Sequence, residues 1–275
     1  MWPRSISFCS FMPPRTKGET GASRRQNSTL AKRARLDVVL VEQGHFASRE
    51  QAQRAVMAGE VRLGDRVLNK SSIEVPPDAE LSVAAPPKYV GRGGLKLEGA
   101  LDRFALAPAR MIALDIGAST GGFTDCLLQR GARKVYAIDV GHGQLAWKIR
   151  QDPRVVVREH LNARHLTRAD IPEPIDLCVI DVSFISLTLI LPNAFELLTP
   201  TGVVLALIKP QFELQPEDVG RGGIVSDPAL HEKAQRKISD WVIAHGQVVT
   251  GLVESPITGT DGNKEFFICA RKPLA

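Results

Sequence analysis

The chain has 275 residues, of which 44% are hydrophobic and 24% are charged, so it can hold one full domain and a smaller one of ordinary globular composition. The four cysteines lack paired metal-ligand spacing, which argues against a zinc site and a disulfide framework and favours a reducing cytoplasm. No apolar run approaches the roughly 20 residues that cross a bilayer, and no signal-peptide core follows the N-terminal basic residues. We therefore expect a cytoplasmic protein without membrane contact.

The positive charge of the chain is concentrated at its N-terminus. The formal net charge is +5, but residues 1–35 contain eight Lys and Arg and one Glu, which gives +7 here and −2 for the remainder. Residues 1–33 are rich in Ser, Arg, Thr, Gly and Pro without hydrophobic periodicity, so a disordered basic tail is expected. The net charge is therefore no evidence that the folded part binds nucleic acid, although the tail would attract phosphate.

A small α+β unit is predicted over residues 34–86. Apolar positions over 36–41 fit one face of a helix that ends at Gly44. A second helix begins after the N-cap Ser48 and ends at Gly59. Three short strands follow, at 61–63, 67–68 and 81–83.

This unit resembles the S4 domain, a small RNA-binding module. The matching residues are Arg35-Leu36-Asp37, Ser48-Arg49-Glu50-Gln51-Ala52, Ala58-Gly59-Glu60-Val61 and Val67. The resemblance implies that the second helix lies against RNA backbone, with Arg35, Arg49 and Arg54 as contacts. On charge alone, Arg49 and Arg54 would fit a solvated helix face equally well.

Tandem prolines at 86 and 87 mark the end of this unit, because they favour extended backbone over helix. Residues 87–94 are predicted as a linker, in which Arg92 is a further candidate RNA contact. The second domain is predicted over 95–275 and opens with a helix whose apolar positions surround Lys96.

A nucleoside-cofactor site is predicted at residues 112–124. The apolar run at 112–116 is typical of a buried parallel strand, and the glycines after it open a tight turn into a helix. The spacing Gly117-x-x-x-Gly121-Gly122 differs from the GxGxxG of a dinucleotide loop. A second strand ends in Asp139, where a carboxylate can accept hydrogen bonds from a ribose.

The loop resembles the S-adenosylmethionine (SAM) loop of class I methyltransferases. The resemblance implies that Asp115 faces the amino-acid end of SAM, that Asp139 binds its ribose and that Asn162 lies near its adenine. The candidate cofactor-binding residues are Asp115, Gly117, Ser119, Gly121, Gly122, Phe123, Asp139, Asn162 and Asp181.

Strand and helix patterns alternate through the rest of the chain. Strands are expected near 135–138, 155–157, 177–180, 203–208, 248–253 and 266–270, and helices near 123–130, 145–151, 187–198 and 228–245. Repeated β-α units indicate an α/β doubly wound sheet with ligands at the carboxyl ends of its strands. The predicted fold is thus a class I (Rossmann-like) methyltransferase sheet with a small N-terminal α+β S4 domain.

Charged residues stand where buried strands end. Asp181 follows the strand at 177–180, Lys209 follows the strand at 203–208, and Glu265 opens the last strand. A charge after a long apolar run has no evident structural benefit. Together with Lys96, these residues are expected to place two lysines and two carboxylates at the cofactor edge of the sheet.

Several motifs in the same order resemble the TlyA family, which joins an S4 domain to an FtsJ-like ribose methyltransferase domain. They are Gly91-Arg92-Gly93-Gly94-Leu95-Lys96-Leu97, the loop 115–124, Asp181-Val182-Ser183-Phe184-Ile185-Ser186, Lys209-Pro210-Gln211-Phe212-Glu213, Gly222-Gly223-Ile224-Val225 and Gly262-Asn263-Lys264-Glu265-Phe266-Phe267. The resemblance implies SAM-dependent 2′-O-methylation of cytidines in 16S and 23S rRNA.

The same resemblance implies a catalytic tetrad of Lys96, Asp181, Lys209 and Glu265. A ribose 2′-hydroxyl is a poor acid, so a lysine is expected to act as base or to orient the hydroxyl. We assign this role to Lys209 or Lys96, with Lys209 preferred. The other lysine would hold the nucleotide or stabilise the negative charge that develops on the oxygen. Asp181 and Glu265 would position the two ammonium groups.

Other readings of the sequence remain open at this point. The rivals are a noncatalytic RNA-binding or ribosome-assembly factor, a membrane-active haemolysin, suggested only by the family's older name, and a nicotinamide-binding reductase, which the loop spacing disfavours. The histidines have no metal-ligand spacing, so no metal site is expected. The expected partner is rRNA within 30S or 50S ribosomal subunits, without an obligate protein partner.

Overall fold

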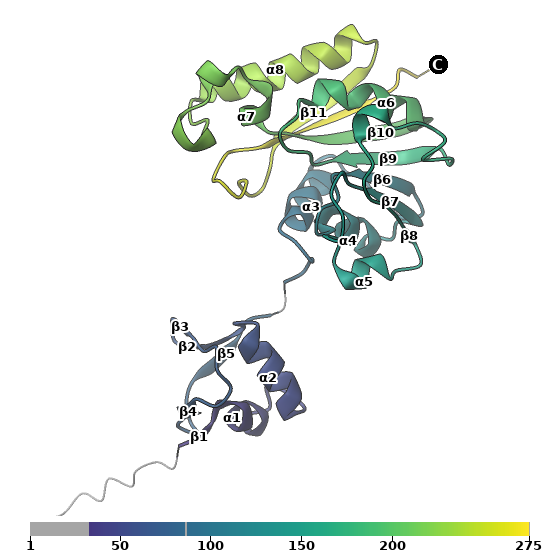
Figure 1. Cartoon of the computed structure of the whole chain (residues 1–275). Coiled ribbons are helices and arrows are strands. Elements are labelled where there is room, and N and C mark those ends of the chain that lie inside the picture. Colours follow the sequence, from purple (N-terminus) through teal and green to yellow (C-terminus); the bar gives the residue numbers. More distant parts are fainter. Residues whose placement is uncertain (1–32, 86, 275) are drawn as a thin grey trace, which may run out of the picture. The chain divides into compact units, whose positions relative to one another are not determined.

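The computed structural model describes residues 33–85 and 87–274, which divide into an N-terminal unit and a C-terminal unit at residue 86 (Figure 1). The basic tail predicted over 1–33 lies outside the described residues, apart from Arg33. Among the residues that the structure describes, no helix is long and apolar enough to cross a membrane.

The N-terminal unit, residues 33–85, contains two helices and short antiparallel strand pairs. Its elements are β1 (Ala34–Arg35), α1 (Leu36–Glu42), α2 (Arg49–Met57), β2 (Val61–Leu63), β3 (Arg66–Val67), β4 (Glu74–Val75) and β5 (Leu81–Val83). Strand β2 pairs with β3 and β5, and β1 pairs with β4. The apolar faces of both helices pack into one core with residues of β2, β4 and β5.

Both predicted helices of this unit are present, with the expected ends. The hydroxyl of Ser48 caps α2 by accepting a hydrogen bond from the backbone N–H of Gln51 at 3.4 Å. Gly44 and Gly59, just past the two helices, have φ values of +78° and +74°, a conformation that glycine adopts without strain.

The C-terminal unit, residues 87–274, is built on a seven-stranded sheet in the order β11-β12-β10-β9-β6-β7-β8. The strands are β6 (Ile112–Ile116), β7 (Lys134–Ile138), β8 (Val155–Arg158), β9 (Ile175–Ile180), β10 (Leu198–Ile208), β11 (Val248–Glu254) and β12 (Phe266–Arg271). Strand β12 is antiparallel to both neighbours, and the remaining pairs are parallel. Because β7 lies on one side of β6 and β9 on the other, the order reverses at β6, where such sheets bind ligands.

Helices cover both faces of this sheet (Figure 1). They are α3 (Gly93–Arg103), α4 (Gly122–Gln129), α5 (Trp147–Arg150), α6 (Leu191–Leu197), α7 (Pro210–Glu213) and α8 (Pro228–Ala244), with the short 3-10 turns η1 (Ala163–His165), η2 (Leu187–Leu189), η3 (Pro216–Asp218) and η4 (Arg221–Gly223). Alternate residues of β6 enter two cores, since Leu114 packs with α6 and α8 whereas Ala113 packs with α3 and α4.

Two predicted helices differ from the observed elements. The helix expected over 187–198 is divided into η2 and α6, because Pro192 lacks a backbone N–H and its ring opposes a continuous helix. The helix expected over 145–151 is the single turn α5, because Ala146 before it is extended, with ψ at 139°. The six strands predicted after the loop all form, within a few residues of the expected bounds.

Candidate functional site

The loop after β6 brings together the carboxyl ends of three neighbouring strands. The backbone N–H groups of Gly117 and Ala118 both donate to the carbonyl oxygen of Ile138 at the end of β7, at 2.9 and 3.1 Å. A Cβ atom at Gly117 would lie 2.3 Å from the backbone oxygen of Asp181, so only glycine lets the loop approach the end of β9 this closely. Its φ of +87° requires glycine for a second reason.

Asp139 at the end of β7 holds the loop from the other side. Its Oδ2 accepts a hydrogen bond from the backbone N–H of Ser119 at 2.8 Å, and its Oδ1 accepts one from Gly141 at 2.8 Å. Each carboxylate oxygen can accept a further hydrogen bond, and the side chain is only half-buried. The Asp139 carboxylate is therefore fixed in place and still able to bind hydroxyl groups of a nucleoside.

A cavity of about 510 Å³ opens beside Asp139, within the size range of small-molecule sites. Apolar side chains of the strand ends and a few polar groups line it, among them Ile138, Asp139, Leu161, Asn162, Arg164, Val182 and Ile190. The Asn162 side chain accepts from the Arg164 backbone N–H at 3.0 Å, which leaves its amide N–H₂ for other partners. The volume and the donor set fit a nucleoside cofactor such as SAM.

A second cavity of about 370 Å³ meets the first, since Gly117, Ser119, Asp181, Ser183 and Phe184 line both. Its other lining residues include Arg92, Lys96, Gly122, Phe123, Lys209, Phe212 and Glu265. All four members of the predicted tetrad thus lie around one cavity, next to the cofactor-sized one.

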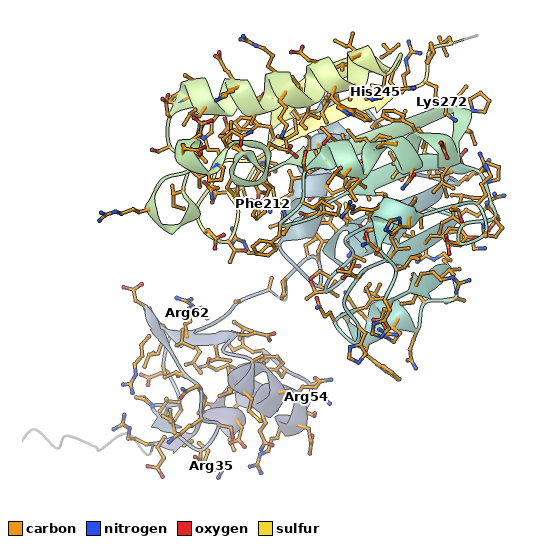
Figure 2. The ribbon with its side chains drawn as sticks, turned by 45° about the horizontal axis from the view of Figure 1, so that its top comes forward. Arg35, Arg54, Arg62, Phe212, His245 and Lys272 are labelled. Atoms are coloured by element: carbon orange, nitrogen blue, oxygen red, sulfur yellow. The ribbon has the colours of Figure 1, made fainter. Side chains whose placement is uncertain are left out.

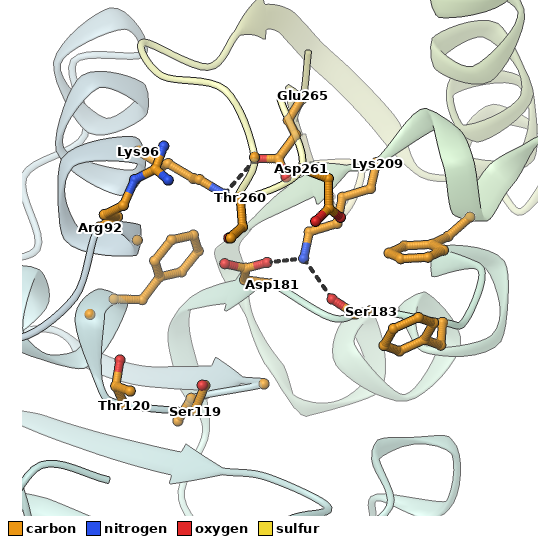
Figure 3. A pocket seen from close by; sticks show the side chains of 18 of the residues that line it. Arg92, Lys96, Ser119, Thr120, Asp181, Ser183, Lys209, Thr260, Asp261 and Glu265 are labelled. Atoms are coloured by element: carbon orange, nitrogen blue, oxygen red, sulfur yellow. Dashed lines mark hydrogen bonds and ion pairs between the residues drawn. The ribbon is translucent and has the colours of Figure 1, made fainter. Parts of the chain in front are cut away.

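The tetrad forms two ion pairs (Figure 3). Lys209 Nζ lies 2.6 Å from Asp181 Oδ1 and donates to Ser183 Oγ at 3.0 Å. Lys96 Nζ lies 2.6 Å from Glu265 Oε2, and their side chains are only 10% and 3% exposed. The two ammonium groups point into the cavity from opposite sides, from α3 and from the end of β10 (Figure 3).

Asp115 lies within β6, just before the loop. Its side chain is fully buried within β6 and lines neither cavity. Oδ2 accepts a hydrogen bond from Thr124 Oγ1 at 2.6 Å, whereas Oδ1 has no hydrogen-bond partner among the described residues. Burial, with the nearby carboxylates of Asp181 and Asp139 adding to it, raises the pKa of Asp115 to about 7. In the structure Asp115 thus contacts Thr124, and its contact with the amino-acid end of the cofactor stays a prediction.

The remaining loop residues divide between the cavity and the protein interior. Gly121, with φ at +94°, lines neither cavity, and a Cβ atom there would meet Leu145 at 2.8 Å. A Cβ atom at Gly122 would lie 3.0 Å from the backbone nitrogen of Gly94, so this glycine lets α3 approach the loop. Phe123 lines the second cavity and packs on Phe267.

Two residues of this site have a position that sequence reasoning missed. Glu213 is buried, and its carboxylate accepts from Ser186 Oγ at 2.6 Å and from the Leu187 backbone N–H at 2.7 Å. It therefore fixes the segment that follows Asp181. Phe184 is 90% exposed at the mouth of both cavities, with its ring 5.0 Å from that of Phe212. Both residues belong to motifs that the sequence displays, but their roles depend on partners more than 25 residues away.

The four arginines predicted to contact RNA have different surroundings. Arg35 and Arg49 both form ion pairs with Asp37 in the N-terminal unit, at 3.0 Å each. Arg54 is exposed on α2, as Figure 2 shows. Arg92, in the C-terminal unit, lines the second cavity and donates to the carbonyl oxygen of Thr258 at 3.0 Å.

Comparison with known proteins identifies both units. The FtsJ-like methyltransferase family matches residues 89–272, and the S4 domain matches residues 34–81. A solved structure of an S-adenosylmethionine dependent methyltransferase from Mesorhizobium loti shares the fold, with a TM-score of 0.50 and 14% identity over 66% of this chain and 100% of that one. The predicted class I methyltransferase fold is therefore confirmed, and fold and family together imply the use of SAM.

Closer relatives extend over both units. The 16S/23S rRNA (cytidine-2′-O)-methyltransferase TlyA of Mycobacterium tuberculosis is 43% identical over 88% of this chain and 91% of its own length. Hemolysin A of Brachyspira hyodysenteriae is 41% identical over 84% of this chain and 97% of its own length. The solved structure of a candidate hemolysin from Streptococcus thermophilus has a TM-score of 0.67 and 45% identity, over 87% of this chain and 88% of that one. The chain belongs to the FtsJ-like methyltransferase family and, within it, to the S4-containing TlyA group.

Proposed function

We propose that this protein transfers a methyl group from SAM to the 2′-hydroxyl of cytidines in ribosomal RNA. The observation that carries the proposal is the pairing of Lys209 with Asp181 and of Lys96 with Glu265 around one cavity that adjoins a cofactor-sized one. The sequence relationship to a curated 16S/23S rRNA (cytidine-2′-O)-methyltransferase, over almost the whole chain, supports the same assignment.

The residues of the first cavity would hold the cofactor. Asp139 would accept hydrogen bonds from the ribose hydroxyls, Asn162 would contact the adenine, and the Asp181 end of the cavity would receive the amino-acid portion. When bound there, SAM supplies an electrophilic methyl group on a positively charged sulfur. Asp181 and Asp139 place negative charge around that cation.

Lys209 is the proposed acceptor of the hydroxyl proton. In this step the methyl–sulfur bond would break as the new O–CH₃ bond forms, which leaves a neutral thioether. The 2′ O–H bond would break as well, and its proton would pass to Nζ of Lys209 in its unprotonated amine form. The resulting ammonium is held by Asp181 Oδ1 and Ser183 Oγ, the two acceptors that contact Nζ in the structure. This arrangement stabilises the charge that the step places on Lys209.

The other side of the cavity would hold the nucleotide. Lys96, paired with Glu265, brings a positive charge toward the ribose or its phosphate, and Arg92 adds a guanidinium at the rim. The exposed ring of Phe184 offers a surface on which the attached base can stack. The N-terminal unit would add contacts to the RNA backbone through Arg35, Arg49 and Arg54.

The test is tritiated methyl transfer from SAM to purified 30S and 50S subunits. The wild-type protein is expected to label one or both, at a site where the sugar-phosphate bond resists alkaline cleavage, since a 2′-O-methyl group removes the attacking hydroxyl. Lys209→Ala should abolish the label, whereas Lys264→Ala, a change at an exposed lysine paired with Glu254, should leave it intact. Measurable SAM binding without label on either subunit would favour a noncatalytic RNA-binding protein.

A further inference from the structure

A buried carboxylate joins two arginines of the N-terminal unit. Asp37, in the first turn of α1, has a fully buried side chain, whereas the side chains of Arg35 and Arg49 are 46% and 52% exposed. Arg35 donates to both carboxylate oxygens, through Nε and Nη2 at 3.0 Å each. Arg49 Nη2 and Gln53 Nε2 donate to Oδ2 at 3.0 and 2.7 Å. Three side chains from β1 and α2 therefore converge on one acid.

The cluster keeps its charges at neutral pH. The hydrogen bonds from Arg35, followed by those from Gln53 and Arg49, hold the pKa of Asp37 well below its usual range although burial opposes this. The two guanidinium groups and one carboxylate thus leave one net positive charge, much of it exposed. A guanidinium has five N–H donors, and the contacts with Asp37 use two from Arg35 and one from Arg49. Within the residues that the structure describes, the remaining donors have no hydrogen-bond partner and can face a ligand.

A flexible arginine loses rotamer freedom when it binds a phosphate, and this loss weakens binding. The two contacts to Arg35 and the contact to Arg49 have already fixed these side chains on one face of the unit. We propose that Asp37 is a positioning residue for RNA binding, which holds Arg35 and Arg49 in conformations that can bind phosphates of the RNA backbone. This inference rests on the proposed function, because it assumes that the N-terminal unit contacts RNA.

The direction in which Asp37→Asn changes the affinity for RNA separates the proposal from a simple charge effect. Asp37→Asn removes a negative charge beside two arginines, so charge alone predicts tighter binding to RNA and a steeper salt dependence. Loss of positioning predicts the opposite. We expect the affinity of the full chain for transcribed 16S rRNA, measured by filter binding over a series of KCl concentrations, to fall several-fold. The slope of log affinity against log salt should shrink by about 1. Unchanged or tighter binding would overturn the proposal.

The matched control is Glu42→Gln, at the far end of the same helix. It removes the same charge from an exposed side chain and does not touch the arginines, so it should leave binding unchanged or slightly tighter. Thermal unfolding of each variant shows whether the unit still folds. If Asp37→Asn does not, Gln53→Leu decides: it removes one contact to Asp37 without changing any charge, and it should still weaken binding several-fold. Wild-type affinity in folded Gln53→Leu would then refute positioning.

The double variant Arg35→Ala with Arg49→Ala separates this inference from the proposed function. If the double variant binds the rRNA as tightly as the wild type, the N-terminal unit does not contact RNA through this face, and the RNA part of the proposed function fails. If the double variant binds weakly while Asp37→Asn binds normally, the arginines contact RNA and only the positioning role of Asp37 is wrong.

Discussion

The two units use charged residues in opposite surroundings. In the C-terminal unit, Lys96 and Glu265 form a nearly buried pair at the wall of a cavity. In the N-terminal unit, Arg35 and Arg49 are half-exposed and share the single buried carboxylate of Asp37. The first arrangement presents few charges to a small, enclosed ligand, whereas the second presents excess positive charge to solvent.

This difference separates two contributions to one reaction. Charges in an enclosed site interact strongly and are weakly screened by salt, so they can act on the reacting atoms. Exposed arginines are screened by salt and contribute mainly to affinity for a polyanion. Changes in the tetrad should therefore alter the rate at saturating RNA, and changes near Asp37 should alter the affinity and its salt dependence.

The largest expected effect tests whether Lys209 transfers a proton or only supplies charge. Lys209→Arg keeps a cation that can pair with Asp181, but an arginine side chain does not lose its proton in proteins. We expect methyl transfer at saturating RNA and SAM to fall about 10²- to 10⁴-fold, the usual contribution of a general base. Single-turnover assays with labelled SAM measure it. A variant that retains more than about a tenth of the rate would assign Lys209 an orienting role only.

The second prediction concerns the stability of the buried pair. Lys96→Met or Glu265→Gln alone leaves one charged or polar partner buried without its counterpart, which costs about 3–5 kcal/mol. Combining the two changes should restore most of that stability while methyl transfer stays lost. Urea unfolding of both single variants and the double variant measures this coupling.

An exposed pair provides the comparison for that experiment. Lys264 and Glu254 form an ion pair at 3.1 Å with side chains that are 53% and 51% exposed. Changing either should cost about 0–1 kcal/mol, because water and salt screen the pair. Equal losses at the buried and exposed pairs would show that burial of the tetrad has no energetic consequence.

The tetrad was predicted through the family resemblance, and a general rule of the fold also brings two of its members together. Lys209 and Asp181 each follow an apolar run, and parallel strands bring their carboxyl ends to one edge of the sheet. Runs of apolar residues likewise predicted the strands of the sheet, and five of them, β6, β7, β9, β10 and β12, are buried along most of their length. Boundaries were less predictable where a proline or an extended residue interrupts a helix, as at Pro192 and Ala146.

Positions that depend on distant partners could not be predicted in the same way. Asp115 lies inside β6, and the sequence does not show that Thr124 donates to one of its carboxylate oxygens within the core. A glutamate such as Glu213 is expected at the surface. Its carboxylate is instead buried, where it accepts hydrogen bonds from the Leu187 backbone N–H and the Ser186 hydroxyl. Residues 87–94, predicted as a linker, include Val90, whose backbone N–H donates to Asp125 Oδ2 of α4 at 2.8 Å.

The third prediction uses the raised pKa of Asp115. In the folded protein this group binds a proton up to about pH 7, whereas in the unfolded chain it loses the proton near its ordinary value of 3.8. The folded state therefore binds the extra proton between these values, and stability falls as pH rises through that window. Asp115→Asn removes the ionisation and keeps an oxygen that can accept from Thr124. The free energy of unfolding of Asp115→Asn minus that of the wild type should therefore be roughly 2–3 kcal/mol larger at pH 8 than at pH 5.

Urea unfolding at the two pH values measures the effect of Asp115→Asn. Asp125→Asn is the control, because Asp125 is also a buried acid of the C-terminal unit but contacts Lys148. A difference between Asp115→Asn and wild type that does not change with pH would contradict ionisation of Asp115 in this range.

The smallest expected effect concerns Phe184, which lines a cavity and is also exposed to solvent. Phe184 lines the second cavity but is 90% exposed, so its removal should not reduce the stability of the fold. Phe184→Ala should weaken the productive binding of RNA by about 1–3 kcal/mol, the contribution of one base stacked on an aromatic ring. Phe184→Tyr should restore it.

The kinetic parameter distinguishes stacking from chemistry at this position. If Phe184 only receives the base, the KM for RNA rises in Phe184→Ala and the rate at saturating RNA stays near the wild-type value. If the ring also fixes the ribose against Lys209, the rate falls as well, because a misplaced hydroxyl reacts slowly however tightly the RNA binds. Since an aromatic ring carries no charge, either loss should depend on salt less than the loss caused by Asp37→Asn. A salt dependence equal to that of Asp37→Asn would place Phe184 with the phosphate-binding groups instead.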